Sequence, residues 1–137
     1  MTNSVFETGS DILPRFSFGD SPELANNLLA LVLNGFKTAT CSALDEFEGS
    51  EIPRVGEQSV IEDGERRAAC RIETISVETI PFDKVSASFA YLEGEGDRSL
   101  AHWRTVHEAY FRMQGKFAPE MPLVCEIFKI LEIYRRY

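Results

Sequence analysis

The sequence predicts an α+β domain in which a curved mixed sheet, or a small β-barrel, is flanked by helices. Two segments carry apolar residues at helical spacing, and four others alternate or run apolar as strands do. The strand segments are joined by one hairpin and by long excursions, which makes a regular parallel sheet a poor fit. A chain of 137 residues suits a single domain, 1–137, whose residues 1–14 we expect to be a flexible N-terminal segment.

The first helix is predicted between Asp20 and Gly35. Asp20 or Ser21 can accept a hydrogen bond from a free backbone N–H at the helix start, and Pro22 suits the first turn. The apolar residues at helical spacing are Leu24, Leu28 and Leu31. Glycine is common directly after a helix, so we expect the chain to leave the helix at Gly35.

Four strands are predicted after this helix, over residues 38–43, 57–62, 68–79 and 123–134. The pair Asp63-Gly64 is a strong signal for a hairpin between the second and third strands. The acidic and turn-rich residues 45–56 are expected to form a loop.

Two more helices are predicted between the third and fourth strands, a short one over 83–90 and a longer one over 99–111. Asp97 or Ser99 can cap the longer helix. Its apolar stripe consists of Leu100, Trp103, His107 and Tyr110.

The aromatic and histidine residues of the longer helix allow more than one role. Trp103 and Tyr110 suit the core or a pocket wall, and a platform on which a base stacks is the alternative. His102 and His107 are five residues apart, so they do not share a helix face as the metal-binding pair of an HExxH helix does. We expect one of them to face the core and the other to face solvent.

Composition and charge limit the classes of partner. A net charge of −8 argues against binding to duplex DNA, because proteins that coat it are normally basic. The sequence lacks an apolar run of about 18 residues for a membrane span, and residues 1–14 lack the basic start and the apolar stretch that are typical of a signal peptide. We therefore expect a cytoplasmic protein without membrane contact, and the choice between a monomer and a homodimer stays open.

The cysteines are Cys41, Cys70 and Cys125. They are odd in number, far apart and without a CxxC pair, which fits neither a disulfide framework nor a zinc site. We expect three reduced and mostly buried thiols, with a catalytic cysteine as the less favoured alternative.

The stretch "NGFKTATCS", residues 34–42, places a lone lysine between the first helix and the first strand. Lys37 and Thr40 would face opposite sides of a regular strand, so they can meet only if the chain bends between them. An exposed lysine is the ordinary alternative. In a pocket, desolvation would lower the pKa of Lys37 and make it a base, or its charge could hold a phosphate or carbonyl oxygen.

The stretch "LEGEGDRS" carries three carboxylates at alternate positions, Glu93, Glu95 and Asp97. In an extended segment all three would face one way, and their repulsion would raise the pKa of at least one of them. Such a set suits a general acid, a general base or a divalent ion such as Mn²⁺ or Mg²⁺. The alternative is a solvated acidic loop in which Asp97 only caps the next helix.

Two stretches together, "GFKTAT" and "EGEGDRSLAHWR", followed by a β-rich C-terminus, resemble the ASCH (activating signal cointegrator homology) domain family in its stand-alone bacterial form. The resemblance covers about residues 16–132. It implies a PUA-like β-barrel flanked by helices, with a cleft between them that binds single-stranded RNA or modified nucleosides.

The resemblance implies two activities, cleavage of single-stranded RNA and deacetylation of N4-acetylcytidine. The lysine, threonine and glutamate of the deacetylating members correspond to Lys37, Thr40 and, as first choice, Glu95, with Glu93 as second choice. We expect first a ribonuclease acting in a cleft lined by these residues and Asp97, and a divalent ion belongs to this alternative only. The N4-acetylcytidine amidohydrolase and a non-catalytic module that binds RNA or a modified nucleoside are the other two hypotheses.

Further residues are expected to contact the substrate. Arg98 and Arg104 could contact phosphate, and Trp103 or Tyr110 could stack on a base. The full set of predicted substrate-binding residues is Ser42, Glu93, Asp97, Arg98, Trp103, Arg104 and Tyr110. The acidic net charge favours small ligands over a polyanion.

Overall fold

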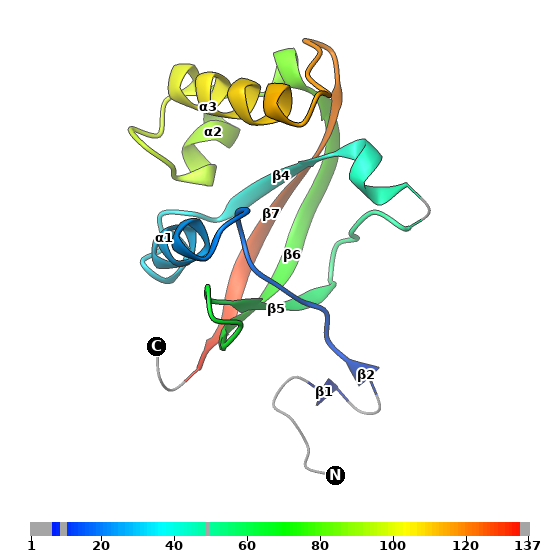
Figure 1. Cartoon of the computed structure of the whole chain (residues 1–137). Coiled ribbons are helices and arrows are strands. Elements are labelled where there is room, and N and C mark those ends of the chain that lie inside the picture. Colours follow the sequence, from blue (N-terminus) through cyan, green and yellow to red (C-terminus); the bar gives the residue numbers. More distant parts are fainter. Residues whose placement is uncertain (1–6, 9–10, 49, 135–137) are drawn as a thin grey trace.

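The computed structural model describes residues 7–8, 11–48 and 50–134 (Figure 1). Its main sheet has five strands in the order β3-β5-β6-β7-β4. These strands are β3 (Arg15–Phe16), β4 (Ala39–Ala43), β5 (Gln58–Glu62), β6 (Ala68–Pro81) and β7 (Pro122–Ile133). β3 runs parallel to β5 and the other pairs are antiparallel, so the predicted α+β fold with a mixed sheet is confirmed.

The sheet is bent by irregular pairing along its two longest strands. The register of β6 against β7 shifts between Arg71 and Ile72 and again between Thr74 and Ser76. Such bulges bend a strand and increase its twist. In the described part of the chain β3 and β4 are the edges of this sheet, so of the two predicted architectures the curved mixed sheet is observed.

The N-terminal segment contains structure that the sequence analysis missed. β1 (Glu7–Thr8) and β2 (Asp11–Ile12) pair as a short antiparallel ladder within the segment expected to be flexible. Residues 1–6 and 9–10 lie outside the described residues, and the flexibility of the segment stays a prediction.

Helix α1 (Pro22–Leu33) has the boundaries that its sequence signals predict. The Ser21 hydroxyl accepts a hydrogen bond from the Leu24 N–H at 3.1 Å, and Gly35 leaves the helix with a φ of +82°. Because glycine lacks a Cβ, it takes this left-handed conformation without strain. The turn delivers residues 36–38 to the start of β4.

Helices α2 (Ala87–Glu93) and α3 (Leu100–Met113) are capped by serines at their first turns. The predicted helix over 83–90 is displaced, because a 3₁₀ turn, η2 (Phe82–Lys84), precedes a separate helix that begins after Ser86. The predicted loop over 45–56 likewise begins inside a 3₁₀ turn, η1 (Leu44–Phe47).

Two apolar clusters stabilise the domain. One lies where α2 and α3 cover β4 and β7, and includes Phe82, Trp103, Phe111 and Leu123. The other lies between α1 and strands β5, β6 and β7, and includes Phe18, Leu29, Ile61 and Phe128. The candidate functional site lies between these two clusters. The helices in the described part of the chain are too short or too polar to span a membrane.

Trp103→Ala should lower the free energy of unfolding by about 3–5 kcal/mol, because truncating a buried aromatic side chain leaves a cavity. The Trp103 side chain is only 3% exposed and its ring centroid lies 5.2 Å from that of Phe82. Urea denaturation measures the change. Met113→Ala, at a position 86% exposed on the same helix, is the control and should change stability by no more than about 0.5 kcal/mol. Equal small losses in both variants would contradict the assignment of Trp103 to the core.

Candidate functional site

A pocket of about 660 Å³ lies between the two apolar clusters. Its volume falls in the range of small-molecule sites. The predicted site residues that line it are Lys37, Thr40, Ser42, Glu93, Glu95 and Tyr110. Phe18 and Phe128 from one cluster and Phe111 from the other form apolar parts of its wall.

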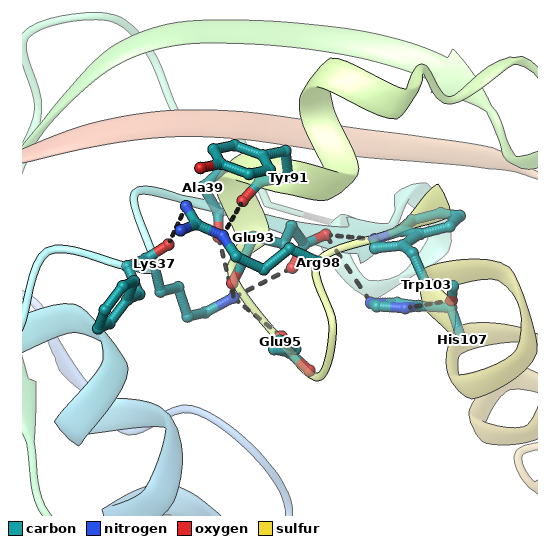
Figure 2. Close-up of polar contacts among 9 residues, drawn as sticks. Lys37, Ala39, Tyr91, Glu93, Glu95, Arg98, Trp103 and His107 are labelled. Carbon is teal, nitrogen blue, oxygen red and sulfur yellow. Dashed lines mark hydrogen bonds and ion pairs between the residues drawn. The ribbon is translucent and has the colours of Figure 1, made fainter. Parts of the chain in front are cut away.

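Lys37 lies at the inner wall of this pocket and is 2% exposed. Its ammonium donates hydrogen bonds to the Ala39 carbonyl at 2.9 Å, to Glu93 Oε1 at 3.1 Å and to Glu95 Oε2 at 3.1 Å (Figure 2). Three N–H donors of one ammonium therefore have three close acceptors. The lysine is not the exposed residue that composition alone would favour.

Lys37 and Thr40 line the same pocket because the strand begins only at Ala39. The N–H groups of Phe36 and Lys37 both donate to the Leu31 carbonyl, so Lys37 still belongs to the turn that ends α1. The bend that the sequence spacing required is therefore present between Lys37 and Thr40.

Glu93 is the last residue of α2, and its carboxylate is 2% exposed. Its Oε1 atom accepts from Lys37, and its Oε2 atom accepts from Trp103 Nε1 at 2.9 Å (Figure 2). His107 Nε2 lies 3.8 Å from the same Oε2 atom. The carboxylate thus joins α2 to the α1 turn on one side and to α3 on the other.

The electrostatics of the pair differ from what the sequence suggested. Burial alone would lower the pKa of Lys37, but attraction to Glu93 and Glu95 outweighs burial and the pKa is raised. Burial alone would raise the pKa of Glu93, but Lys37, His107 and the Trp103 hydrogen bond outweigh it and the pKa is lowered. Of the two alternatives predicted for a pocket lysine, the base with a lowered pKa is therefore wrong, because the raised pKa keeps Lys37 an ammonium ion at neutral pH.

The three carboxylates of the acidic stretch do not share one face, as an extended segment would have required. Glu93 ends a helix, Gly94 reverses the chain with a φ of +76°, and Glu95 returns to Lys37. Asp97 is exposed, and its Oδ1 accepts from the Ser99 N–H at 2.9 Å. Hydrogen bonds from the Ser99 hydroxyl and, second, from the Ser99 N–H lower the pKa of Asp97. Neither Asp97 nor Glu93 therefore shows the rise that mutual repulsion predicted for at least one of the three carboxylates.

The loop after α2 is fastened to the residue before Lys37. A Cβ at position 94 would collide with the Phe36 carbonyl oxygen. Arg98 stacks on the Tyr91 ring at 3.7 Å and donates to the carbonyls of Tyr91 at 3.1 Å and Phe36 at 3.2 Å (Figure 2). These contacts hold the Lys37 backbone against the end of α2.

Several predicted substrate contacts lie elsewhere. Arg98 is engaged in the loop, Arg104 is exposed with its Nη2 3.4 Å from the Asp83 carbonyl, and Trp103 is buried in the core. These three residues and Asp97 are not among the described residues that line the pocket. Ser42 and Tyr110 are, and the Tyr110 side chain is 38% exposed.

Three residues at the site were not among those predicted from the sequence. The Phe18 ring lies 5.3 Å from Lys37 Nζ, and the ring of His107 stacks on Trp103 with centroids 4.3 Å apart. Burial and the nearby Glu93 carboxylate raise the pKa of the partly buried Cys41 thiol, which also faces the pocket. The position of Cys41 directly after Thr40 was the signal that could have placed Cys41 at the site. The sequence does not show, however, that α3 packs against this strand.

Comparisons with known proteins agree with this architecture. A family model described as ASCH domain matches residues 14–132. Protein EF3133 from Enterococcus faecalis V583, assigned to DUF984, is 38% identical, with a TM-score of 0.82 over 91% of this chain and 80% of its own. An ASCH domain from Lactobacillus crispatus JV V101 is 34% identical, with a TM-score of 0.79 over 87% of this chain and 80% of its own.

A third solved structure, hypothetical protein PH0355, shares the fold at 11% identity, with a TM-score of 0.60 over 88% of this chain and all of its own. No curated protein matches the chain.

Gly94→Ala should destabilise the protein more than Gly115→Ala does. Both glycines have positive φ, so each alanine carries a left-handed penalty of about 1–2 kcal/mol. Only the Cβ at position 94 meets the Phe36 carbonyl, because nothing lies within 4 Å at position 115. Urea denaturation should show a loss at position 94 at least about twice that at position 115. Equal losses would mean that the loop does not need this close approach.

Glu93→Gln should lower the free energy of unfolding by about 3 kcal/mol at neutral pH, because Lys37 loses the buried one of its two carboxylate partners. The Glu93 pKa lies below its ordinary 4.5, so its contribution is present above that pH and is lost as the pH falls through the folded value. The difference in unfolding free energy between wild type and variant should therefore become smaller below pH 4.5, as urea denaturation measures.

The matched control is Glu108→Gln on α3, which removes an exposed ion pair with Arg112. Exposed pairs contribute about 0–1 kcal/mol, so this variant should be nearly silent. If the loss of unfolding free energy in Glu93→Gln did not depend on pH, this would contradict an ionised Glu93.

Proposed function

The chain belongs to the ASCH domain family, and we propose that it hydrolyses an amide on a substrate of nucleoside size, with N4-acetylcytidine as the first to test. The observation that carries the proposal is a buried ammonium, Lys37, in the wall of a pocket that also contains the Thr40 hydroxyl and Glu95. This is the lysine, threonine and glutamate set that the family resemblance implies.

The charge of the pocket favours a neutral substrate over single-stranded RNA. The carboxylates among the described lining residues are Glu46, Glu51, Glu57, Glu93, Glu95 and Glu126. Lys37 is the one lysine or arginine among them, and two glutamates already bind it. A phosphate chain would meet repulsion there, and the net charge of −8 would repel it at longer range.

The proposed chemistry assigns each residue one task. The Thr40 hydroxyl attacks the amide carbonyl while the Glu95 carboxylate, 24% exposed, takes its proton. The N–H groups of the Lys37 ammonium already have acceptors, so Lys37 stabilises the oxyanion through its positive charge and keeps its own proton, which fits its raised pKa. Glu95 then returns the proton to the departing amine, and water hydrolyses the resulting ester of Thr40.

The apolar wall supports the same class of substrate. Phe16, Phe18 and Tyr110 line the pocket with aromatic rings. Stacking of a base on such a ring contributes about 1–3 kcal/mol and needs no phosphate contact. An uncharged base with an acetylated amine can stack on these rings, and its acetyl carbonyl can interact with the buried cation.

Thr40→Val should reduce turnover of N4-acetylcytidine by about 100-fold or more, because it keeps the shape of the side chain and removes the hydroxyl. The matched control is Thr38→Val, since Thr38 is partly buried two residues earlier and does not line the pocket. Chromatographic detection of cytidine and acetate measures the rate, and thermal unfolding checks that both variants fold.

The same proteins should be tested on a fluorescent single-stranded RNA with Mn²⁺ or Mg²⁺. Cleavage of RNA that depends on Thr40 or Lys37, without nucleoside turnover, would replace the proposal by a ribonuclease. Tight binding of the nucleoside without turnover would instead indicate a non-catalytic module.

A further inference from the structure

A second set of donors lies on the α3 side of Glu93. The Cys41 thiol, a Glu93 carboxylate oxygen and a His107 ring nitrogen all lie within 4.8 Å of one another. Among residues 7–8, 11–48 and 50–134 this is the one such group of three cysteine, histidine or carboxylate donors. We propose that Cys41, Glu93 and His107 form a binding site for a divalent transition-metal ion of the zinc type.

The orientation of His107 fits a metal ligand. Its Nδ1 atom lies 2.9 Å from the Trp103 carbonyl oxygen, which can only accept, so Nδ1 carries the proton. In the neutral ring Nε2 then carries a lone pair, and this nitrogen lies 3.8 Å from Glu93 Oε2. A cation bound beside these two atoms can take a lone pair from each. A backbone carbonyl that holds the other ring nitrogen is typical of histidines that bind metals.

Glu93 can serve this site without releasing Lys37. Its Oε1 atom faces the ammonium, whereas its Oε2 atom faces α3 (Figure 2). A carboxylate oxygen has two lone pairs, so Oε2 can keep the Trp103 hydrogen bond and still bind an ion.

Charge balance supports the same site. One ammonium between two carboxylates, Glu93 and Glu95, leaves a net charge of −1 when Cys41 and His107 are neutral. A divalent ion that displaces the Cys41 proton to solvent adds two positive charges and one negative charge. The buried cluster then becomes neutral, which removes an electrostatic cost of burial.

The donor types favour zinc over other divalent ions, and the number of donors leaves one coordination position open. A thiolate, an imidazole and one carboxylate suit zinc, whereas magnesium and manganese prefer oxygen donors. Three protein ligands leave one position of a tetrahedron free. Cys41, Glu93 and His107 all line the pocket, so the free position is accessible to water or a small ligand. The inference does not depend on the proposed amide hydrolysis.

The test uses the full chain, reduced and stripped of metal with a chelator, and titrates it with Co²⁺ as a spectroscopic substitute for Zn²⁺. Wild type should bind one ion per chain, develop a thiolate-to-cobalt charge-transfer band and lose the bound Co²⁺ to added Zn²⁺. Cys41→Ala should lose the band, and His107→Gln should weaken binding at least about 10-fold. Cys70→Ala on β6 and His102→Gln on α3 are the matched controls and should behave as wild type.

A second readout needs no variant. Zn²⁺ should protect Cys41 of the wild-type protein from alkylation, as mass spectrometry detects, and should leave the labelling of Cys70 unchanged. The proposal is overturned by wild type that shows no charge-transfer band, by a band that persists in Cys41→Ala, by binding that His107→Gln leaves unchanged, or by equal alkylation of Cys41 with and without Zn²⁺.

Discussion

The buried carboxylate of Glu93 sets a requirement that the surrounding structure has to meet. An ionised carboxylate that is removed from water and left unpaired costs several kcal/mol. Lys37, from the turn after α1, and the Trp103 indole, from α3, supply the hydrogen bonds that water would have made. One side chain therefore links α2 and α3 to the turn after α1, where Lys37 lies 56 residues earlier in the sequence.

The same requirement limits the chemistry of the pocket. Lys37 is surrounded by acceptors and keeps its proton, so it offers a fixed positive charge and not a base. The other charged lining groups are carboxylates, and these disfavour a polyanion. A neutral ligand with a carbonyl that develops negative charge during reaction is the kind of substrate that gains most from this arrangement.

Local signals in the sequence were enough for most elements and for part of the site. The caps at Ser21 and Ser99 and the glycine after α1 located two helices, because these features depend on neighbouring residues only. The acidic stretch was misread, since Gly94 reverses the chain with a positive φ and the alternation of a strand does not apply.

The directions of the pKa shifts and the grouping of Cys41 with His107 depend on contacts between distant segments, which spacing along the chain does not contain. The protein has a single tryptophan, so its indole N–H gives one resolvable NMR signal, and in this structure that N–H donates to Glu93. Following the indole signal through an acid titration measures the protonation of Glu93 directly. We expect a shift with a midpoint below 4.5, the ordinary pKa of a glutamate, and the loss of this shift in Glu93→Gln. A midpoint at or above 4.5, or the same titration in the variant, would contradict an ionised Glu93 at the centre of the site.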